Sequence, residues 1–208
     1  MRVASVNISP VRHVEYRGHA ISTGIFKRPV AGRIMARELG LDGDAQADRG
    51  CHGGPDMAVY AFTQENYEYW AKELGRSDLH DGKFGENLTV TGMPESEVCI
   101  GDRFRIGEAV VEVSIPRAPC SKLAMVMDDP EFPKRFLESL DVGFYLRVVR
   151  EGLLGAGDAI ERIHADPARL SIREVTRLMF FERENIAGAA ARAKWRRKFG
   201  DRVPTPST

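Results

Sequence analysis

Short apolar runs separated by glycine fill the first 160 residues of the chain. Their length and period predict strands and a mainly β fold. The predicted strands are Val3–Ile8, Ala58–Phe62, Asn87–Thr91 and Gly143–Val149. We also expect a hairpin, because the apolar runs 103–106 and 109–115 are joined by two residues of which glycine is the first, as a type II′ turn requires.

Helical spacing of apolar side chains predicts two helices between these strands. The first covers Gln64–Leu74, with Thr63 as its capping residue and Gly75 as its stop. The second runs over residues 130–140 and begins with a proline, which is tolerated in a first helical turn. Since strand and helix do not alternate regularly, a β-barrel with helical insertions fits the pattern better than a doubly wound sheet.

The pattern changes after residue 163 and becomes helical. Ser171 and Glu174 have the spacing of a capping box, and apolar positions at helical spacing follow them. Residues 185–198 continue as a basic, alanine-rich helical segment. We therefore expect a barrel domain over residues 1–164 and a small C-terminal helical domain over residues 165–208.

Composition narrows the class of protein. The 208 residues are 43% hydrophobic, enough for one full domain, or a domain with a small appendage. Thirty basic and thirty acidic residues cancel, so overall charge gives no reason to expect a nucleic-acid or anionic-membrane partner. From residue 165 onward the net charge is +5. The basic segment 191–198 could bind RNA or an acidic electron-donor protein. The electron-donor protein is the better hypothesis. Without a visible signal peptide or membrane span, we expect a cytoplasmic protein.

The three cysteines, Cys51, Cys99 and Cys120, argue against a disulfide framework or a four-cysteine zinc site, because their number is odd and no CxxC spacing occurs. Cys120 follows an apolar strand and stands between Arg117 and Lys122. Nearby cations favour the thiolate, which attacks electrophiles and binds soft metals. The alternative is that a free cysteine is only a small buried apolar side chain, and this interpretation suits Cys99 better.

A glycine-rich segment over residues 43–56 holds a second group of candidates. Asp44, Asp48 and His52 are spaced at i, i+4 and i+8, which on a helix would favour a hydrolytic metal site. Four glycines interrupt that spacing, so a loop that brings backbone close to a ligand is the better interpretation.

Two further segments are less specific. Lys27, Arg28 and Arg33 collect three cations in a glycine-bounded stretch that would suit a phosphate, although cations on a solvated strand are more common. Glu86 and Asn87 follow a glycine at a strand start, which by itself indicates a turn.

Taken together, four segments resemble the MOSC domain, the module named for the C-terminal part of molybdenum-cofactor sulfurases. They read GDAQADRGCHGGPDMAVYAF, FGENLTVTG, IGDRFRIGEAVVEVSIPRAPCSKL and GFYLRVVREG, and their order matches over roughly residues 20–163. The segment beginning SIREVTRLM resembles the small three-helix domain of the YiiM-type bacterial members, which are associated with detoxifying N-hydroxylated purines. A β-barrel is the fold that this resemblance implies.

The resemblance also implies a cofactor and a reaction. A molybdenum-pterin cofactor would be bound in the barrel with Cys120 as its thiolate ligand, and an N-hydroxylated base or amine would be reduced to the amine and water. Lys27 and Arg28 would hold the pterin phosphate, and Glu86 and Asp56 are candidates for the acid. The remaining cofactor contacts that it implies are Arg49, His52, Gly53, Gly54, Asn87 and Arg117.

Electrons would come from a separate, flavin-type reductase, because no GxGxxG sequence follows a strand in this chain. A hypothesis from a different class is a sulfur carrier, in which Cys120 holds a persulfide and passes it to a cofactor-assembly enzyme. The same activated thiol serves both hypotheses, so the residues alone leave both open.

Overall fold

The computed structural model describes residues 1–45, 47 and 53–182, and it is mainly β, as predicted. Its strands are β1 (Arg2–Ile8), β2 (Arg12–Tyr16), β3 (His19–Thr23), β4 (Arg28–Pro29), β5 (Arg33–Arg37), β6 (Gly40–Leu41), β7 (Val59–Thr63), β8 (Leu88–Thr91), β9 (Arg103–Ile106), β10 (Ala109–Pro116), β11 (Phe144–Arg150), β12 (Gly152–Gly155) and β13 (Ile160–His164). Its helices are the 3₁₀ turn η1 (Pro55–Met57), α1 (Gln64–Leu74), α2 (Ser121–Met127), α3 (Phe132–Glu138) and α4 (Ile172–Phe180).

The main sheet has eight strands in the order β13-β9-β10-β11-β7-β8-β1-β4. It curls strongly, because β1 returns to the segment that leads into β13, where Val3 N donates to Asp158 O at 2.9 Å and Gly157 N donates to Val3 O at 2.8 Å. A single antiparallel bridge, Arg2 to Ala159, joins the two parts. The expected barrel is thus a curled open sheet in the described residues, without a continuous closing ladder.

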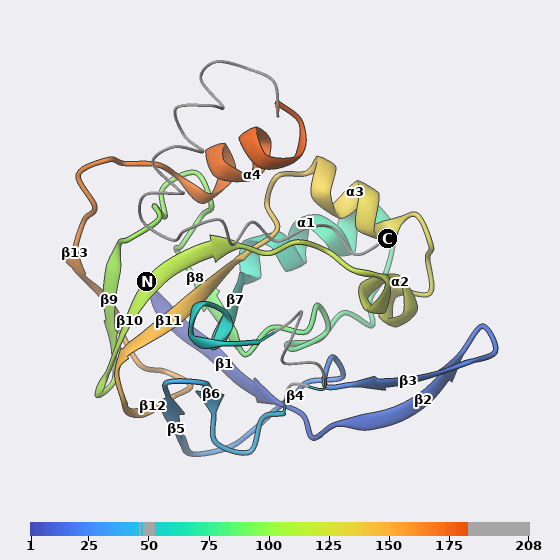
Figure 1. Ribbon diagram of the computed structural model, residues 1–208, viewed down its shortest axis with the longest axis horizontal. Helices are drawn as coiled ribbons and strands as arrows, with labels where there is room; N and C mark the ends of the chain where they lie inside the picture. Colours follow the sequence, from blue (N-terminus) through green and yellow to red (C-terminus); the bar gives the residue numbers. More distant parts are fainter. Residues whose placement is uncertain (46, 48–52, 183–208) are drawn as a thin grey trace.

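Two smaller sheets flank the main one. The sheet β12-β5-β6 lies below it in Figure 1, and the β2–β3 hairpin projects from the body of the molecule. At Thr23, the last residue of β3, the chain turns back towards the main sheet and continues through Gly24 and Ile25. This return brings an early segment of the sequence beside the candidate site described below.

Helix α1 has the predicted bounds. The Thr63 hydroxyl accepts from Asn66 N at 3.2 Å, and Gly75 ends the helix in the left-handed conformation. The second predicted helix is shorter than expected: α3 begins at Phe132, because the Asp129 carboxylate first accepts from Glu131 N and holds a turn. It ends before Leu140, whose φ is +62°. Helix α2, which follows Cys120, was not predicted.

The helices α1, α2 and α3 cover one side of the sheet and enclose an aromatic cluster (Figure 1). Phe62 from β7 lies at its centre, with ring centroids 4.5 Å from Phe84 and 5.7 Å from Phe136. Trp70 of α1 packs edge-on against Phe132 of α3 at 4.9 Å. Burial of these large rings contributes several kcal/mol per ring and fixes β7 against the helices.

At the C-terminal side, Ser171 caps α4 as predicted, its hydroxyl accepting from Glu174 N. Ile172 and Val175 pack into the same core as the main sheet. The predicted helical segment 185–198 lies outside the described residues. Within the described residues, no helix combines the length and the apolar character that crossing a bilayer requires.

Glu95 is a buried carboxylate that ties three segments together. Its Oε1 accepts from Asn66 Nδ2 of α1 at 2.8 Å and from Gly143 N, before β11, at 2.9 Å. Its backbone carbonyl accepts from Arg173 N in the first turn of α4. Burial, together with the neighbouring Asp141 carboxylate, raises the pKa of Glu95 to about 7.

Gly143 lies just before β11, where this strand approaches β7 closely, so a substitution there tests how tightly the two pack. Its φ is +72°, and a Cβ there would lie 2.5 Å from Ala61 O and 2.7 Å from the Tyr60 ring. Gly143→Ala should lower the free energy of unfolding by about 2–4 kcal/mol in urea denaturation. The control, Gly75→Ala, has a positive φ but open space around it and should cost about 1 kcal/mol. Equal losses would contradict the close approach.

Glu95→Gln should change how stability depends on pH. The folded protein keeps the Glu95 proton up to about pH 7, whereas the unfolded chain releases it near the ordinary value of 4.5. Because the folded state then binds more protons, wild-type stability should fall relative to the glutamine variant as pH rises from about 4.5 to 7. Urea denaturation across pH 4–8 measures both proteins, and parallel curves would show that Glu95 does not titrate in this range.

Candidate functional site

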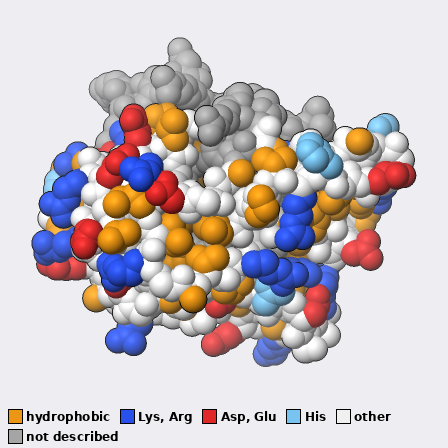
Figure 2. Space-filling view, turned by 90° about the horizontal axis from the view of Figure 1, so that it is seen from below, with side chains coloured by type: hydrophobic (Ala, Val, Ile, Leu, Met, Phe, Trp, Pro, Cys, Tyr) orange, Lys and Arg blue, Asp and Glu red, His pale blue; other side chains and the backbone are white. Residues whose placement is uncertain are grey.

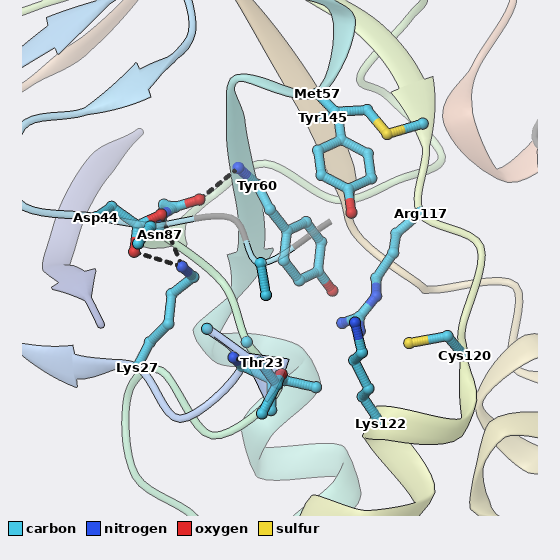
Figure 3. Close-up of a pocket in the computed structure, with 15 residues that line it drawn as sticks. Thr23, Lys27, Asp44, Met57, Tyr60, Asn87, Arg117, Cys120, Lys122 and Tyr145 are labelled. Carbon is cyan, nitrogen blue, oxygen red and sulfur yellow. Dashed lines mark hydrogen bonds and ion pairs between the residues drawn. The ribbon is translucent and has the colours of Figure 1, made fainter. Parts of the chain in front are cut away.

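A pocket of about 100 Å³ opens beside the end of β10, where loops from both halves of the chain meet (Figure 3). It brings together four residues predicted from the sequence: Lys27, Asn87, Arg117 and Cys120. The complete lining among the described residues is Thr23, Gly24, Ile25, Lys27, Asp44, Ala45, Ala47, Met57, Tyr60, Gly85, Asn87, Arg117, Cys120, Lys122 and Tyr145.

Cys120 lies on the pocket wall where the chain leaves β10 and enters α2. Its backbone is extended and occupies the capping position of α2, and its thiol is free and half-buried. Cys99, by contrast, is buried away from the pocket, and its Sγ contacts Glu97 O at 3.6 Å. Of the two described cysteines, Cys120 is therefore the one that can meet a ligand.

Arg117 places a buried positive charge beside Cys120. Its guanidinium lies 4.7 Å from the centre of the Tyr60 ring, and its Nη1 donates to Phe84 O. Within the described residues neither Arg117 nor Lys122, on the same wall, has a carboxylate partner. This side of the pocket thus carries positive charge that no carboxylate of the described chain neutralises.

Lys27 differs, because it forms a buried ion pair on the opposite wall. Its Nζ lies 2.6 Å from Asp44 Oδ1 and 2.8 Å from Oδ2, and the two side chains are 8% and 4% exposed. Burial lowers the pKa of Lys27, and the Asp44 carboxylate opposes that shift. The sequence motif suggested a metal-ligand role for Asp44, whereas the structure shows that it neutralises Lys27.

Asn87 connects this ion pair to the main sheet. Its Nδ2 donates to Asp44 Oδ2 at 2.9 Å, while its Oδ1 accepts from Tyr60 N at 3.1 Å. The backbone Ser9 N also donates a hydrogen bond to Asp44 Oδ1, at 2.9 Å. The pair is therefore joined to β7 and to the residue that follows β1, which holds the 44–45 segment against the pocket.

Among the described residues, the other predicted contacts do not line the pocket. Arg28 is exposed and its Nη1 lies 2.6 Å from His80 Nε2. Gly53 and Gly54 lead into η1 and do not line the pocket. Asp56 accepts from Arg147 in a partly buried ion pair. Arg49 and His52 lie outside the described residues, as does Asp48.

Glu86 is fully buried behind the pocket wall. Its Oε1 accepts three hydrogen bonds, from Tyr67 Oη at 2.6 Å, Gly82 N at 2.6 Å and Thr89 Oγ1 at 2.8 Å. Its Oε2 has no hydrogen-bond partner among the described residues, and burial raises the pKa of the carboxyl group. These bonds hold the 82–86 loop, so the geometry shows a structural role for Glu86.

Two pocket residues, Tyr60 and Tyr145, were not singled out in the sequence. They are register partners on β7 and β11, with ring centroids 5.4 Å apart. Both lie in apolar strands, so the pattern predicted core positions. The one sequence signal for a role in the site was the polar hydroxyl group that each tyrosine carries on an otherwise apolar strand. Among the described residues no cluster of three or more His, Cys, Asp or Glu side chains could hold a metal ion.

A model of the MOSC domain matches residues 48–161. The uncharacterized protein YflK of Bacillus subtilis is 39% identical over 204 residues, which cover 95% of this chain and 92% of YflK. Protein YiiM of Escherichia coli is 40% identical over 143 residues, 68% of this chain and 64% of YiiM. A Gibberella moniliformis protein named a reductase is 34% identical over 165 residues, and the match spans 78% of this chain but 29% of the reductase.

Solved structures agree with these relatives. YiiM from Geobacillus stearothermophilus superposes with a TM-score of 0.78 at 31% identity, covering 95% of this chain and 96% of that one. YiiM from Escherichia coli superposes with a TM-score of 0.68 at 27% identity, covering 97% and 94%.

The ion pair between Lys27 and Asp44 predicts a mutant cycle. Asp44→Asn leaves a buried ammonium without its counter-charge and should cost about 3 kcal/mol of unfolding free energy at pH 7. Adding Lys27→Met removes that charge and should restore much of the loss. Urea denaturation of the two single variants and the double variant measures the coupling. Strictly additive losses would show that the pair is not energetically coupled.

Proposed function

The chain belongs to the MOSC domain family, and we propose that it is an oxidoreductase that reduces N-hydroxylated bases or amines with a molybdenum-pterin cofactor bound in this pocket. One observation carries the proposal: a free Cys120 thiol shares a pocket with two cations that have no carboxylate partner among the described residues. The fungal relative named a reductase, which matches 78% of this chain, supports the same class of activity.

The donor set fits this cofactor. A thiolate is a soft ligand suited to a molybdenum centre, and Cys120 presents its sulfur to the pocket (Figure 3). The pterin phosphate and the sulfur ligands are anionic, and Arg117 and Lys122 supply positive charge on the same wall that no carboxylate of the described residues pairs. Both features come from one short segment, which links the thiol and its counter-charges in the sequence.

The remaining proposed contacts divide by geometry. Asn87 and Lys27 both line the pocket. Lys27 is already ion-paired with Asp44, so it could contact a phosphate only while it keeps that ion pair. Arg28 points to His80 at the surface, outside the pocket lining. We therefore assign the main positive charge for the cofactor to Arg117 and Lys122, while Lys27 and Arg28 contribute less.

When bound, the cofactor would supply the two electrons and the acceptor for the oxygen that leaves nitrogen. The protein would hold it through Cys120 and keep the reacting group in a partly enclosed pocket, with the Tyr60 and Tyr145 rings on one side. Electrons would come from a separate flavin-type reductase. The proposed acids, Glu86 and Asp56, do not line the pocket, so either would act through another group.

Molybdenum analysis of Cys120→Ala tests the proposal. Both proteins are expressed with molybdate in a host that makes the pterin, and Cys99→Ala is the control because Cys99 lies away from the pocket. Wild type and Cys99→Ala should contain near-stoichiometric molybdenum and reduce an N-hydroxylated purine. Cys120→Ala should lose at least about tenfold in both.

Two results would count against this proposal. Full molybdenum and full reduction in Cys120→Ala would remove the ligand assignment. A folded wild-type protein that carries labile sulfur on Cys120 and no molybdenum, beside a loaded control protein, would favour the sulfur carrier instead.

A further inference from the structure

The Tyr145 hydroxyl is an unused hydrogen-bond donor inside the pocket. The Tyr145 ring is half-buried against Tyr60, and its hydroxyl points toward the space between Tyr60 and Arg117 (Figure 3). Within the part of the chain that the structure describes, that hydroxyl makes no hydrogen bond. Because the hydroxyl lines the pocket and the described chain leaves it without a partner, a ligand atom that enters the pocket can accept its hydrogen bond.

The neighbouring Tyr60 hydroxyl, by contrast, already has a hydrogen-bond acceptor within the protein. The two tyrosines are cross-strand partners with similar surroundings, yet the Tyr60 hydroxyl donates to Val142 O at 2.9 Å. Its donor capacity is therefore consumed by the protein. Tyr145 is the member of the pair that remains able to donate to a ligand.

The neighbours of Tyr145 define which ligand group it would meet. Arg117 and Lys122 are donors without acceptor capacity, and both line this side of the pocket. Asp44, the carboxylate among the described lining residues, is already bound by Lys27, Asn87 and Ser9 N. Three donors and no available carboxylate favour an acceptor atom on the ligand, such as an oxygen.

We propose that Tyr145 donates a hydrogen bond to the oxygen of the substrate's N-hydroxyl group and thereby distinguishes the N-hydroxylated compound from its amine. This inference rests on the proposed function. The hydrogen bond breaks no bond itself; it fixes the direction of the N–O bond before reduction. A site built to hydrogen-bond a hydroxyl group discriminates strongly against the analogue that lacks it.

The surroundings of the pocket are compatible with such a small, flat substrate. Seen from below, the molecule exposes Lys and Arg side chains together with apolar ones on its underside, near the base of the projecting arm formed by β2 and β3 (Figure 2). Thr23, Gly24 and Ile25, where that arm returns to the body of the molecule, also line the pocket. The Tyr60 and Tyr145 rings add aromatic surface against which a base can stack.

The test compares wild type, Tyr145→Phe and the control Tyr69→Phe, whose ring is half-exposed on α1 away from the pocket. Equilibrium dialysis measures binding of N-hydroxyladenine and of adenine to the oxidised, cofactor-loaded proteins without reductant. Molybdenum content and turnover with a chemical reductant are measured in parallel.

We expect Tyr145→Phe to keep its molybdenum, to bind adenine within about twofold of wild type and to bind N-hydroxyladenine on the order of tenfold more weakly. Its kcat/KM should fall by about 10- to 100-fold, while Tyr69→Phe should match wild type. Selective loss of the N-hydroxyl compound is a result that a merely structural change would not produce.

Other outcomes overturn the inference. Equal weakening of both ligands, or loss of molybdenum, would assign Tyr145 a structural role. Unchanged discrimination and turnover would show that its hydroxyl does not meet the substrate. If wild type itself binds molybdenum yet neither prefers nor reduces N-hydroxyladenine, the proposed function fails first and the role of Tyr145 falls with it.

Discussion

The pocket depends on one buried ion pair. Lys27 and Asp44 lie 17 residues apart in the sequence. Burying either charge without the other would be strongly unfavourable. Asp44 also accepts from Ser9 N and Asn87, so the pair joins the residues after β1, the start of β8 and the loop before η1. A buried charge pair contributes little net stability, but it permits few alternative geometries. Here it fixes the wall that faces Cys120.

Because that wall is electrically neutral, the chemistry of the pocket comes from the opposite side. Arg117, Cys120 and Lys122 follow one another at the end of β10 and the start of α2, and the Arg117 guanidinium lies over the Tyr60 ring of β7. The aromatic cluster beneath holds β7 in place, with Phe62 packed on Phe84 and Phe136. The rigid, neutral wall and the positive wall together give a site that favours anionic groups and acceptor atoms.

Local signals predicted much of this architecture. The bounds of α1 and the caps at Thr63 and Ser171 were correct, because the capping contacts lie within four residues of each other. Helix α2 was missed, since Cys120 and Pro119 looked like the end of a loop, and its helical residues pack on distant rings. Cys120, Arg117 and Asn87 were predicted in the site and line the pocket. The pairing of Lys27 with Asp44, and the donor role open to Tyr145, depend on contacts between distant segments that no local pattern contains.

The return of β1 to the end of the sheet has a consequence for how the protein is made. β1 precedes its partners in the chain: its last residues pair with the nearby β4, but its other backbone partners lie in β8 and in residues 157–160. Until β8 leaves the ribosome, one edge of β1 lacks its backbone partners, and until residues 157–160 follow, the first part of the other edge lacks them too. Contacts of such long sequence separation form slowly, because a large loop must close first. Before residue 160 has emerged, the nascent chain therefore exposes part of an apolar strand edge, the kind of surface that chaperones bind during translation.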